Sequence, residues 1–322
     1  MQRSMLSLAA IGCILALPGF TAPAHAAFTT FVSQTGNNAN ACTSPAAPCQ
    51  TLAGALAKTD SGGVMHVAPG EYAALLINKS VEIVADGGNV SVANSTINAG
   101  PGSSAVIVVD VAGLDDVRIR GFTLDRHGAP GSGIAFIGLG TLYVENCTLV
   151  NNTGSDSGIA FVPDGPSELY VSDSFISGGS GSPNGVLIRP ANGGAVTAVF
   201  DNTRFENDVF GITIDGRDTF NSNTITIRDT VISGNSSYAI GAIDGGSGET
   251  NVVVEGSTFA RNGTFGVLAN GANVTIRVHN STITNNGTGV SALNGATLIS
   301  NGGNVVRGNT ANGAFTATEA QQ

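Results

Sequence analysis

The chain has 322 residues, of which only 11% are charged, and its 13 basic and 23 acidic residues give a net charge of −10. Disordered chains are usually rich in charge and poor in β-branched residues, so this composition indicates a folded protein. An acidic surface with so few Lys and Arg side chains excludes nucleic acid as the expected partner.

The first 26 residues have the pattern of a secretory signal peptide. Arg3 supplies a positive charge, an apolar run follows from 5 to 17, and Ala24-His25-Ala26 forms a small-residue cleavage site. The run is too short to span a bilayer, and Cys13 lies inside it rather than after it, which disfavours a lipoprotein signal. We therefore expect an exported protein, periplasmic or extracellular, without membrane insertion.

Residues 27–62 differ in composition from the rest of the chain and are predicted to form an N-terminal cap. Cys42 and Cys49 bracket the sequence "CTSPAAPC", and in an exported protein such a pair favours a disulfide. A zinc site is the alternative, although no second Cys/His pair has ligand spacing. The residues 51–58 are predicted to form a short helix.

An eight-residue sequence recurs at intervals of 24 to 29 residues along the rest of the chain. Its copies are "VRIRGFTL" (117–124), "LYVENCTL" (142–149), "LYVSDSFI" (169–176), "AVFDNTRF" (198–205), "ITIRDTVI" (225–232), "VVVEGSTF" (252–259) and "IRVHNSTI" (276–283). The fifth position holds Gly, Asn or Asp, which tolerate left-handed backbone angles, so a corner is expected there. The sixth holds mainly Ser or Thr, so we interpret Cys147 as a packed small residue.

This repeat predicts an all-β solenoid. Each unit contains short alternating runs of Val, Ile and Thr without an apolar stripe at helical spacing. One unit cannot bury its own apolar face, but stacked units share a core. We predict a right-handed parallel β-helix of about nine to ten coils over residues 63–315, followed by a tail at 316–322.

The N-terminal stretch 31–72 supports the same fold. Its strand, Gly/Asn-rich loop, short helix and "VMHVAPGEY" strand end resemble the opening of exported bacterial right-handed β-helix repeat proteins, within the pectate-lyase-like superfamily. The resemblance covers nearly the whole chain after the leader. It implies the fold rather than a chemistry, because the same coil is used by lyases, hydrolases, epimerases, esterases and non-enzymatic surface proteins.

One set of polar residues is a candidate catalytic site. A second recurring column, of Gly and aliphatic residues, ends in Arg189, Asp215 and Asp244, which would occupy successive coils about 4.8 Å apart. Two carboxylates at that spacing could act in glycoside hydrolysis or bind Ca²⁺, and Arg217 and Asp218 would add charge nearby. The alternative is solvated corner residues, because Asp before Gly is common in turns.

Two further patterns bear on binding. Asp125, Arg126 and His127 leave a strand together and could perform acid–base chemistry, although a polar loop produces the same string. Tyr143 and Tyr170 align on successive repeats and are predicted to form an exposed two-ring stack that could bind a glycan.

No complete active-site set of the related enzymes is visible, and no calcium motif supports a metal, so we expect neither a cofactor nor a metal site. The sequence favours an exported β-helix scaffold or binding protein, with polysaccharide as its possible partner. The alternative is a polysaccharide lyase or glycoside hydrolase that acts on an acidic glycan in a groove along the β-helix.

Overall fold

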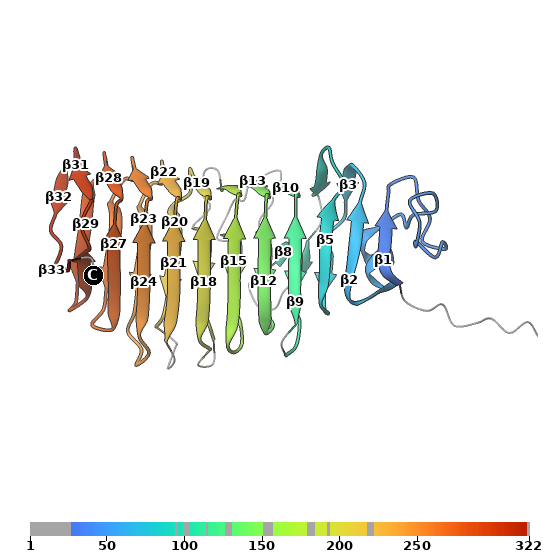
Figure 1. Ribbon diagram of the computed structural model, residues 1–322, viewed down its shortest axis with the longest axis horizontal. Helices are drawn as coiled ribbons and strands as arrows, with labels where there is room; N and C mark the ends of the chain where they lie inside the picture. Colours follow the sequence, from blue (N-terminus) through green and yellow to red (C-terminus); the bar gives the residue numbers. More distant parts are fainter. Residues whose placement is uncertain are drawn as a thin grey trace, which may run out of the picture.

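The computed structural model describes residues 27–93, 96–98, 104–113, 115–125, 131–150, 157–178, 184–191, 194–217 and 222–320. Across these residues the chain winds through three sheets in turn, which we name sheets A, B and C. Figure 1 shows the coils stacked side by side along one axis. The predicted signal peptide, residues 1–26, lies outside the described residues.

Sheet A is the longest of the three and holds twelve parallel strands in the described part of the chain. They are β1 (Ala27–Val32), β2 (Thr59–Val67), β5 (Val81–Ala85), β9 (Asp116–Arg120), β12 (Gly140–Glu145), β15 (Ser167–Ser172), β18 (Val196–Asp201), β21 (Asn223–Arg228), β24 (Thr250–Glu255), β27 (Val274–His279), β30 (Thr297–Ser300) and β33 (Ala317–Thr318).

Sheet B, over the same described ranges, is built from ten short strands. They are β3 (Gly70–Tyr72), β6 (Val90–Val92), β10 (Thr123–Asp125), β13 (Thr148–Val150), β16 (Phe175–Ser177), β19 (Arg204–Glu206), β22 (Val231–Ser233), β25 (Thr258–Ala260), β28 (Thr282–Thr284) and β31 (Val305–Arg307).

Sheet C closes each coil and contains eleven strands where the structure is described, one of which, β7, is antiparallel to its neighbour β8. They are β4 (Leu75–Ile77), β7 (Ile97–Asn98), β8 (Ser104–Val109), β11 (Ser132–Phe136), β14 (Ser157–Phe161), β17 (Asn184–Ile188), β20 (Phe210–Asp215), β23 (Tyr238–Ile243), β26 (Phe265–Asn270), β29 (Thr288–Leu293) and β32 (Ala311–Gly313).

The predicted all-β solenoid is therefore confirmed, with a slightly different number of coils. The recurring eight-residue sequence forms a strand of sheet A, a corner and the start of a strand of sheet B, and it pairs in the expected register, with Leu142 beside Leu169 and Tyr143 beside Tyr170. Pairing also continues past the predicted end of the solenoid, because β33 pairs with β30.

Alternating burial produces the core. In β12 the side chains of Leu142 and Val144 are fully buried, while the side chains between them face outward. Equivalent positions on every coil form apolar columns, and aromatic rings stack in them, as Phe136 does on Phe161 with ring centroids 4.6 Å apart. One coil alone would leave this face exposed, so the stack itself creates the hydrophobic core.

The corners between sheets A and B have the predicted left-handed backbone. Asn146, Asp173 and Asn202 have φ values of 51°, 51° and 48°. Neighbouring corners also interact, since Nδ2 of Asn202 donates to Oδ1 of Asp173 at 2.6 Å. Short polar side chains tolerate this conformation and can bond locally, which explains their recurrence at the fifth position of the repeat.

The N-terminal end of the stack is covered by residues 27–58. Helix α1 (Leu52–Leu56) begins after Thr51, whose side chain accepts a hydrogen bond from the Gly54 amide, as an N-cap residue does. A disulfide joins Cys42 to Cys49, with 5.1 Å between their Cα atoms, which confirms the predicted pair. Within this cap, Cys42 and Cys49 form backbone hydrogen bonds with the edge strand β1, so the end of the sheet is covered rather than left open.

Candidate functional site

Of the three polar residues predicted to align at the end of sheet C, Arg189 and Asp215 align and Asp244 does not. Ile188 pairs with Ile214, so Arg189 and Asp215 occupy equivalent places on neighbouring coils. Asp215, however, pairs with Ile243 rather than with Asp244. The predicted register of Asp244 is therefore wrong by one residue, because the Gly that marks the column in other repeats is displaced in β23.

Asp215 is held by a close ion pair. Arg217 donates from Nε and a terminal nitrogen to the two carboxylate oxygens at 2.8 and 2.7 Å, and its backbone amide donates at 3.3 Å. The Asp215 side chain is only 8% exposed, whereas that of Arg217 is 61% exposed. Burial disfavours the charged carboxylate, but the hydrogen bonds and charge of Arg217, with the charge of Arg189, outweigh it and lower the pKa of Asp215 below its usual value.

A series of hydrogen-bonded, buried polar side chains lies on the outer face of sheet C near Asp215. The Thr213 hydroxyl lies 2.9 Å from the Tyr238 hydroxyl and donates to Oδ1 of Asn184 at 2.5 Å, and Nδ2 of Asn184 donates to Ser157 at 3.3 Å. The ring of Tyr238 lies across Gly241, where a side chain would collide with it. Burial raises the pKa of Tyr238.

The sequence did not reveal this series of hydrogen-bonded side chains, because its residues belong to four different repeats and have different side-chain types. The only available signal was Gly241, a small residue at a position where Thr213 and Leu187 stand on neighbouring coils. A Gly between larger residues on a strand indicates that another group approaches closely.

These electrostatics limit what the end of sheet C can do chemically. A general acid needs a raised carboxyl pKa, but the pKa of Asp215 is lowered. Tyr238 has a raised pKa, so its phenol stays neutral at neutral pH and is a poor base. Asp244 is buried, with Oδ1 accepting from the Gly246 amide at 2.8 Å, which is the local turn bonding expected of Asp before Gly.

The two-ring stack of Tyr143 and Tyr170 is present on the outer face of sheet A. The ring centroids are 5.0 Å apart and the planes differ by 11°. The guanidinium of Arg118 lies 4.2 Å from the Tyr143 centroid on the preceding coil, so both faces of that ring are covered. Tyr170 pairs on its other side with Val199, a smaller side chain that leaves part of the ring face open.

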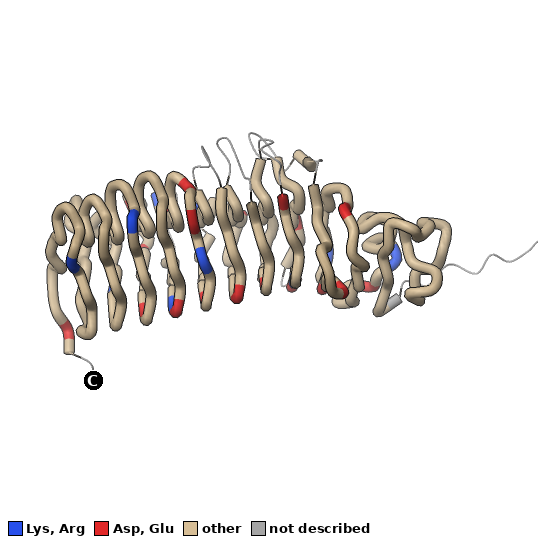
Figure 2. Tube along the Cα trace, turned by 90° about the horizontal axis from the view of Figure 1, so that it is seen from above, with Lys and Arg blue, Asp and Glu red and all other residues tan. Residues whose placement is uncertain are grey.

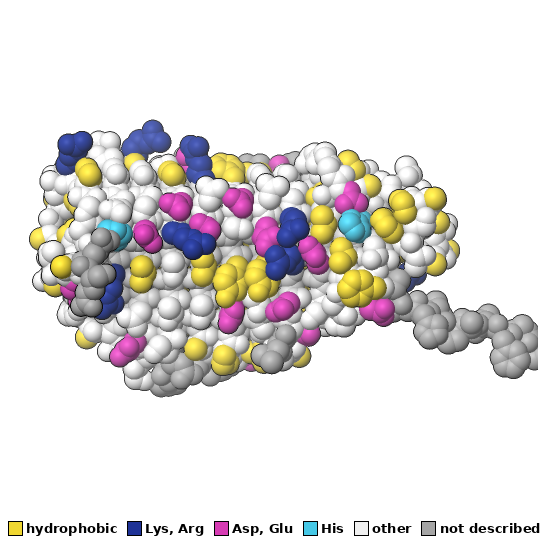
Figure 3. Space-filling model, viewed as in Figure 1, with side chains coloured by type: hydrophobic (Ala, Val, Ile, Leu, Met, Phe, Trp, Pro, Cys, Tyr) yellow, Lys and Arg dark blue, Asp and Glu magenta, His cyan; other side chains and the backbone are white. Residues whose placement is uncertain are grey.

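Two hollows flank this stack on sheet A. One of about 280 Å³ is lined by Glu82, Asp116, Arg118 and Tyr143, among others. The other, of about 400 Å³, extends from Asp116 to Glu168 and on to the next coil. Figure 3 shows this face, where hydrophobic side chains lie beside basic and acidic ones over the middle of the sheet. Asp116 lines both hollows, which are therefore neighbours on the outer face of sheet A, and we name the two together the groove.

The charges along the groove are arranged unevenly. Glu145 binds the guanidinium groups of Arg118 and Arg120, and Glu82 lies 3.5 Å from Arg120, so two carboxylates balance the two cations. Glu168 accepts a hydrogen bond from the Tyr170 hydroxyl at 2.8 Å. Asp116 and Glu168 are exposed and form no ion pair with the other described residues. Charged residues are sparse along the chain (Figure 2), so the carboxylates of Asp116 and Glu168 are distinctive hydrogen-bond acceptors on this face.

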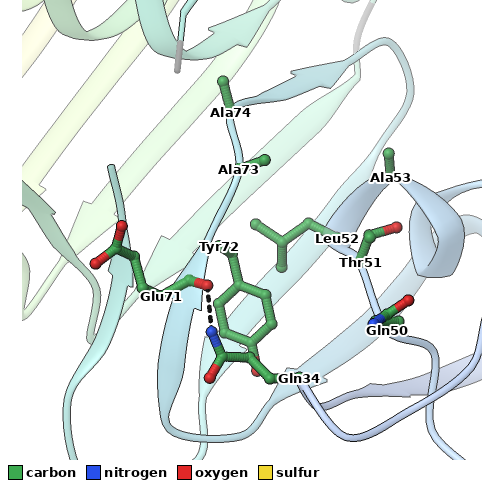
Figure 4. Close-up of a pocket in the computed structure, with 9 residues that line it drawn as sticks. All are labelled: Gln34, Gln50, Thr51, Leu52, Ala53, Glu71, Tyr72, Ala73 and Ala74. Atoms are coloured by element: carbon green, nitrogen blue, oxygen red, sulfur yellow. Dashed lines mark hydrogen bonds between the residues drawn. The ribbon is translucent and has the colours of Figure 1, made fainter. Parts of the chain in front are cut away.

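A third hollow, of about 280 Å³, lies where the cap meets the first coil (Figure 4). Nε2 of Gln34 donates to the Glu71 carbonyl at 2.7 Å, and the Tyr72 hydroxyl donates to the Ala68 carbonyl at 2.8 Å. The polar groups that enclose this hollow therefore bond to the protein itself, and they join the cap to the first coil.

Three of the remaining predicted site residues lie outside the described residues: Arg126, His127 and Asp218. Asp125 is described and ends β10. Cys147 is buried and belongs to the Ser/Thr column as predicted, with its amide donating to Oγ of Ser174 at 3.0 Å. Burial raises the pKa of its thiol to about 11, which makes it a poor nucleophile.

Among the described residues, no group of three or more His, Cys, Asp and Glu side chains could hold a metal ion. The helix found in the same ranges is far shorter than a bilayer requires, and none there could cross a membrane.

Comparison with known proteins supports the architecture. The family model described as "Right handed beta helix region" matches residues 164–320. In the comparison with curated protein sequences, no relative matches the chain.

Several solved structures share the fold at low sequence identity. The pectate lyase Pel9A is 17% identical over 91% of this chain and 78% of its own, with a TM-score of 0.67. A rhamnogalacturonan lyase is 13% identical over 80% and 76%, with a TM-score of 0.51. A GH136 lacto-N-biosidase from Eubacterium ramulus is 11% identical over 91% and 67%, also with a TM-score of 0.51.

Identities this low carry the fold but not an activity. The stacked parallel sheets, the family match and these structural likenesses agree with one another. The chain therefore has a right-handed parallel β-helix fold, like that of the pectate lyase Pel9A.

Proposed function

We propose that this chain is an exported, non-catalytic binding protein that holds a polysaccharide in the groove on the outer face of sheet A. The observation that carries the proposal is the Tyr143–Tyr170 stack, in which Arg118 covers the second face of Tyr143 and Tyr170 has the smaller Val199 on its other side. A rigid aromatic surface beside a few polar acceptors is typical of ligand sites.

The charges of the groove favour a neutral glycan rather than an acidic one. Asp116 and Glu168 offer carboxylate oxygens that accept hydrogen bonds from sugar hydroxyls, while the charges of Arg118 and Arg120 are balanced by Glu145 and Glu82. The whole chain also carries a net charge of −10, which repels polyanions. We therefore infer that the ligand is an uncharged, hydroxyl-rich polysaccharide.

Export is supported by the disulfide between Cys42 and Cys49, since such bonds persist in oxidising compartments. The leader-like residues 1–26 point the same way. Solved structures with the same fold include enzymes named for polysaccharide substrates, which makes glycan binding by this surface reasonable.

The alternative function is a polysaccharide lyase or glycoside hydrolase centred on Asp215. Its support is the convergence of Arg189, Asp215 and Arg217 at the end of sheet C. The ion pair weakens it, because it keeps Asp215 ionised and bonded to Arg217 rather than free to transfer a proton.

Binding to immobilised neutral glucans, mannans and polygalacturonate would test the proposal. We expect retention on a neutral polysaccharide, and a loss of about tenfold in affinity for Tyr170→Ala, since an aromatic contact contributes about 1.4 kcal/mol. Tyr170→Phe, which keeps the ring, should retain most of the affinity. Phe28→Ala is the matched control, because Phe28 is 64% exposed on β1 outside the groove.

Two outcomes would contradict the proposal. Tyr170→Ala could bind as tightly as the wild-type protein, which would remove the stack from the binding site. Release of reducing or unsaturated sugars from any of these polysaccharides, abolished by Asp215→Ala, would instead establish the enzymatic alternative.

A further inference from the structure

The turns between sheets B and C contain a column of asparagines that we name the amide ladder, buried except at its last, partly buried member. Its members are Asn235, Asn262, Asn286 and Asn309 on four successive coils. Nδ2 of each of the first three donates to Oδ1 of the next at 2.9 Å. Each oxygen also accepts from a backbone amide of the preceding coil, so the ladder ties four coils together.

Asp208 occupies the next place in this column, one coil before Asn235. Its backbone amide donates to Oδ1 of Asn235 at 2.9 Å, just as the Asn262 amide donates to Asn286. Its exposed fraction is 3%, similar to those of Asn235, Asn262 and Asn286. By backbone position Asp208 is therefore the first rung of the ladder, with a carboxyl group in place of an amide.

The orientation of this carboxyl group follows from the glycines packed against the rungs. A methyl group added to each of these glycines would come close to one side-chain atom of the rung beside it. In three cases that atom is the amide nitrogen Nδ2: of Asn235 (3.2 Å from Gly211), of Asn286 (3.0 Å from Gly266) and of Asn309 (2.7 Å from Gly289). At Gly185 it is Oδ2 of Asp208, at 2.9 Å. Oδ2 of Asp208 thus stands where the other rungs place the amide nitrogen.

That place requires a hydrogen-bond donor. Besides binding the next rung, Nδ2 of Asn286 donates to the Phe259 carbonyl at 3.0 Å and Nδ2 of Asn309 donates to the Ile283 carbonyl at 3.0 Å. An ionised carboxylate has no proton to donate and would face acceptor oxygens. A protonated carboxyl group can donate one bond from the same place, as an amide does.

The surroundings of Asp208 favour the protonated form. The described residues packed against it are Gly178 and Gly185 on the preceding coil, Phe205 and Asn235, and none of them carries a charge. Glu206, the nearest acidic residue in sequence, is bonded to Arg204 and Ser233 instead. Both carboxyl oxygens of Asp208 are buried, and neither accepts a well-formed hydrogen bond from the described residues; the Gly178 amide approaches the carboxyl group without completing one.

We propose that Asp208 is a neutral carboxylic acid that forms the first rung of the amide ladder, and that its ionisation weakens the coil stack at this rung. Burial, opposed slightly by the Gly178 amide, raises the pKa of Asp208 from 3.8 to about 8. The unfolded chain releases this proton near pH 3.8, whereas the folded chain keeps it up to about pH 8. Folding stability from this group therefore falls as pH rises through that window, and is constant above it.

Thermal unfolding between pH 4 and pH 9 would test this inference with Asp208→Asn, which places the ladder amide at this rung. We expect the melting temperature of D208N to exceed that of the wild-type protein by an amount that grows up to about pH 8 and then levels off. The matched control is Asp229→Asn, which removes the same charge at an exposed corner with φ of 49°. A difference for D208N that does not change with pH, or that D229N reproduces, would overturn the inference.

Carbon-13 NMR of aspartate carboxyl groups in the wild-type protein provides a test that does not depend on stability. The resonance that is missing in D208N should titrate with a midpoint near pH 8. A midpoint near the ordinary aspartate value would show that the rung is ionised at neutral pH and would refute the proposal.

Discussion

The coils that carry the amide ladder (204–320, "the ladder coils") and those that carry the aromatic stack (59–191, "the groove coils") have the same architecture but differ in where their polar side chains point. In the ladder coils, buried Asn side chains bond from coil to coil inside the turns. In the groove coils, Tyr143, Tyr170 and Arg118 stack on the outside of sheet A. The family match at 164–320 covers mainly the ladder coils.

This difference indicates that, in a solenoid, the residues that stabilise the stack can be different from the residues that bind a ligand. Inward columns are shared by all coils and must remain regular, because each coil contacts only its neighbours. Outward columns contribute little to the core, so a few coils can carry a binding surface without disturbing the stack. The following changes test the separation, from the largest expected effect to the smallest.

Removal of one ladder amide should destabilise the ladder coils most. Asn262→Ala would leave the backbone and side-chain nitrogens of Asn235 buried without partners and would remove the donor to the Ile232 carbonyl, while Oδ1 of Asn286 would keep the Asn262 backbone amide. Each such group costs about 1–3 kcal/mol, so we expect a loss of about 3 kcal/mol or more in the free energy of unfolding. Urea unfolding followed by circular dichroism measures this change.

The matched control for the ladder is Asn251→Ala, which removes an amide from the outer face of sheet A. Its Nδ2 contacts only the Glu249 carboxylate at 3.5 Å in the described structure. We expect a change within about 0.5 kcal/mol. Equal effects of the two substitutions would show that inward and outward columns do not differ as argued.

Loss of the disulfide should destabilise the cap at the other end of the stack. Cys42 and Cys49 are seven residues apart, and closing so short a loop contributes about 2–3 kcal/mol through the unfolded chain. The double variant Cys42→Ser/Cys49→Ser should therefore have a lower melting temperature that no longer responds to dithiothreitol. A wild-type protein whose melting temperature is unaffected by dithiothreitol would contradict this expectation.

Replacement of Cys147 by Ser should have the smallest effect. Ser174, in the same column on the next coil, donates to the Ser172 carbonyl at 2.7 Å, and a serine at 147 can donate to the Glu145 carbonyl in the same way. We expect a change in the free energy of unfolding within about 1 kcal/mol. The buried thiol, with its pKa raised to about 11, should react with iodoacetamide only after unfolding in urea. Rapid labelling of the folded protein would refute a purely structural role.

Much of the fold could be predicted because it depends on spacing along the chain. The corner residues Asn146 and Asp173, the Ser/Thr column around Cys147 and the pairing of Tyr143 with Tyr170 all follow from the recurrence of one eight-residue sequence. The disulfide also followed from the spacing of its two cysteines and the expected compartment.

The candidate sites were less predictable, because they depend on exact register and on contacts between unlike residues. A one-residue offset in β23 separates Asp244 from the column of Asp215. Arg118 covers one face of Tyr143, and nothing in the repeat pattern signals that contact. Neither feature changes the periodicity, so neither could be read from it.

The sequence by itself determined the coil, its apolar columns and its corners, because these are set by residue types at fixed spacing. Only the tertiary structure decided which polar groups meet: that Arg217 binds Asp215, that Arg118 covers Tyr143, and that Asp208 completes a column of asparagines. The physical reason is that charge, burial and hydrogen bonding depend on neighbours from other coils, whose positions are fixed only when the stack forms.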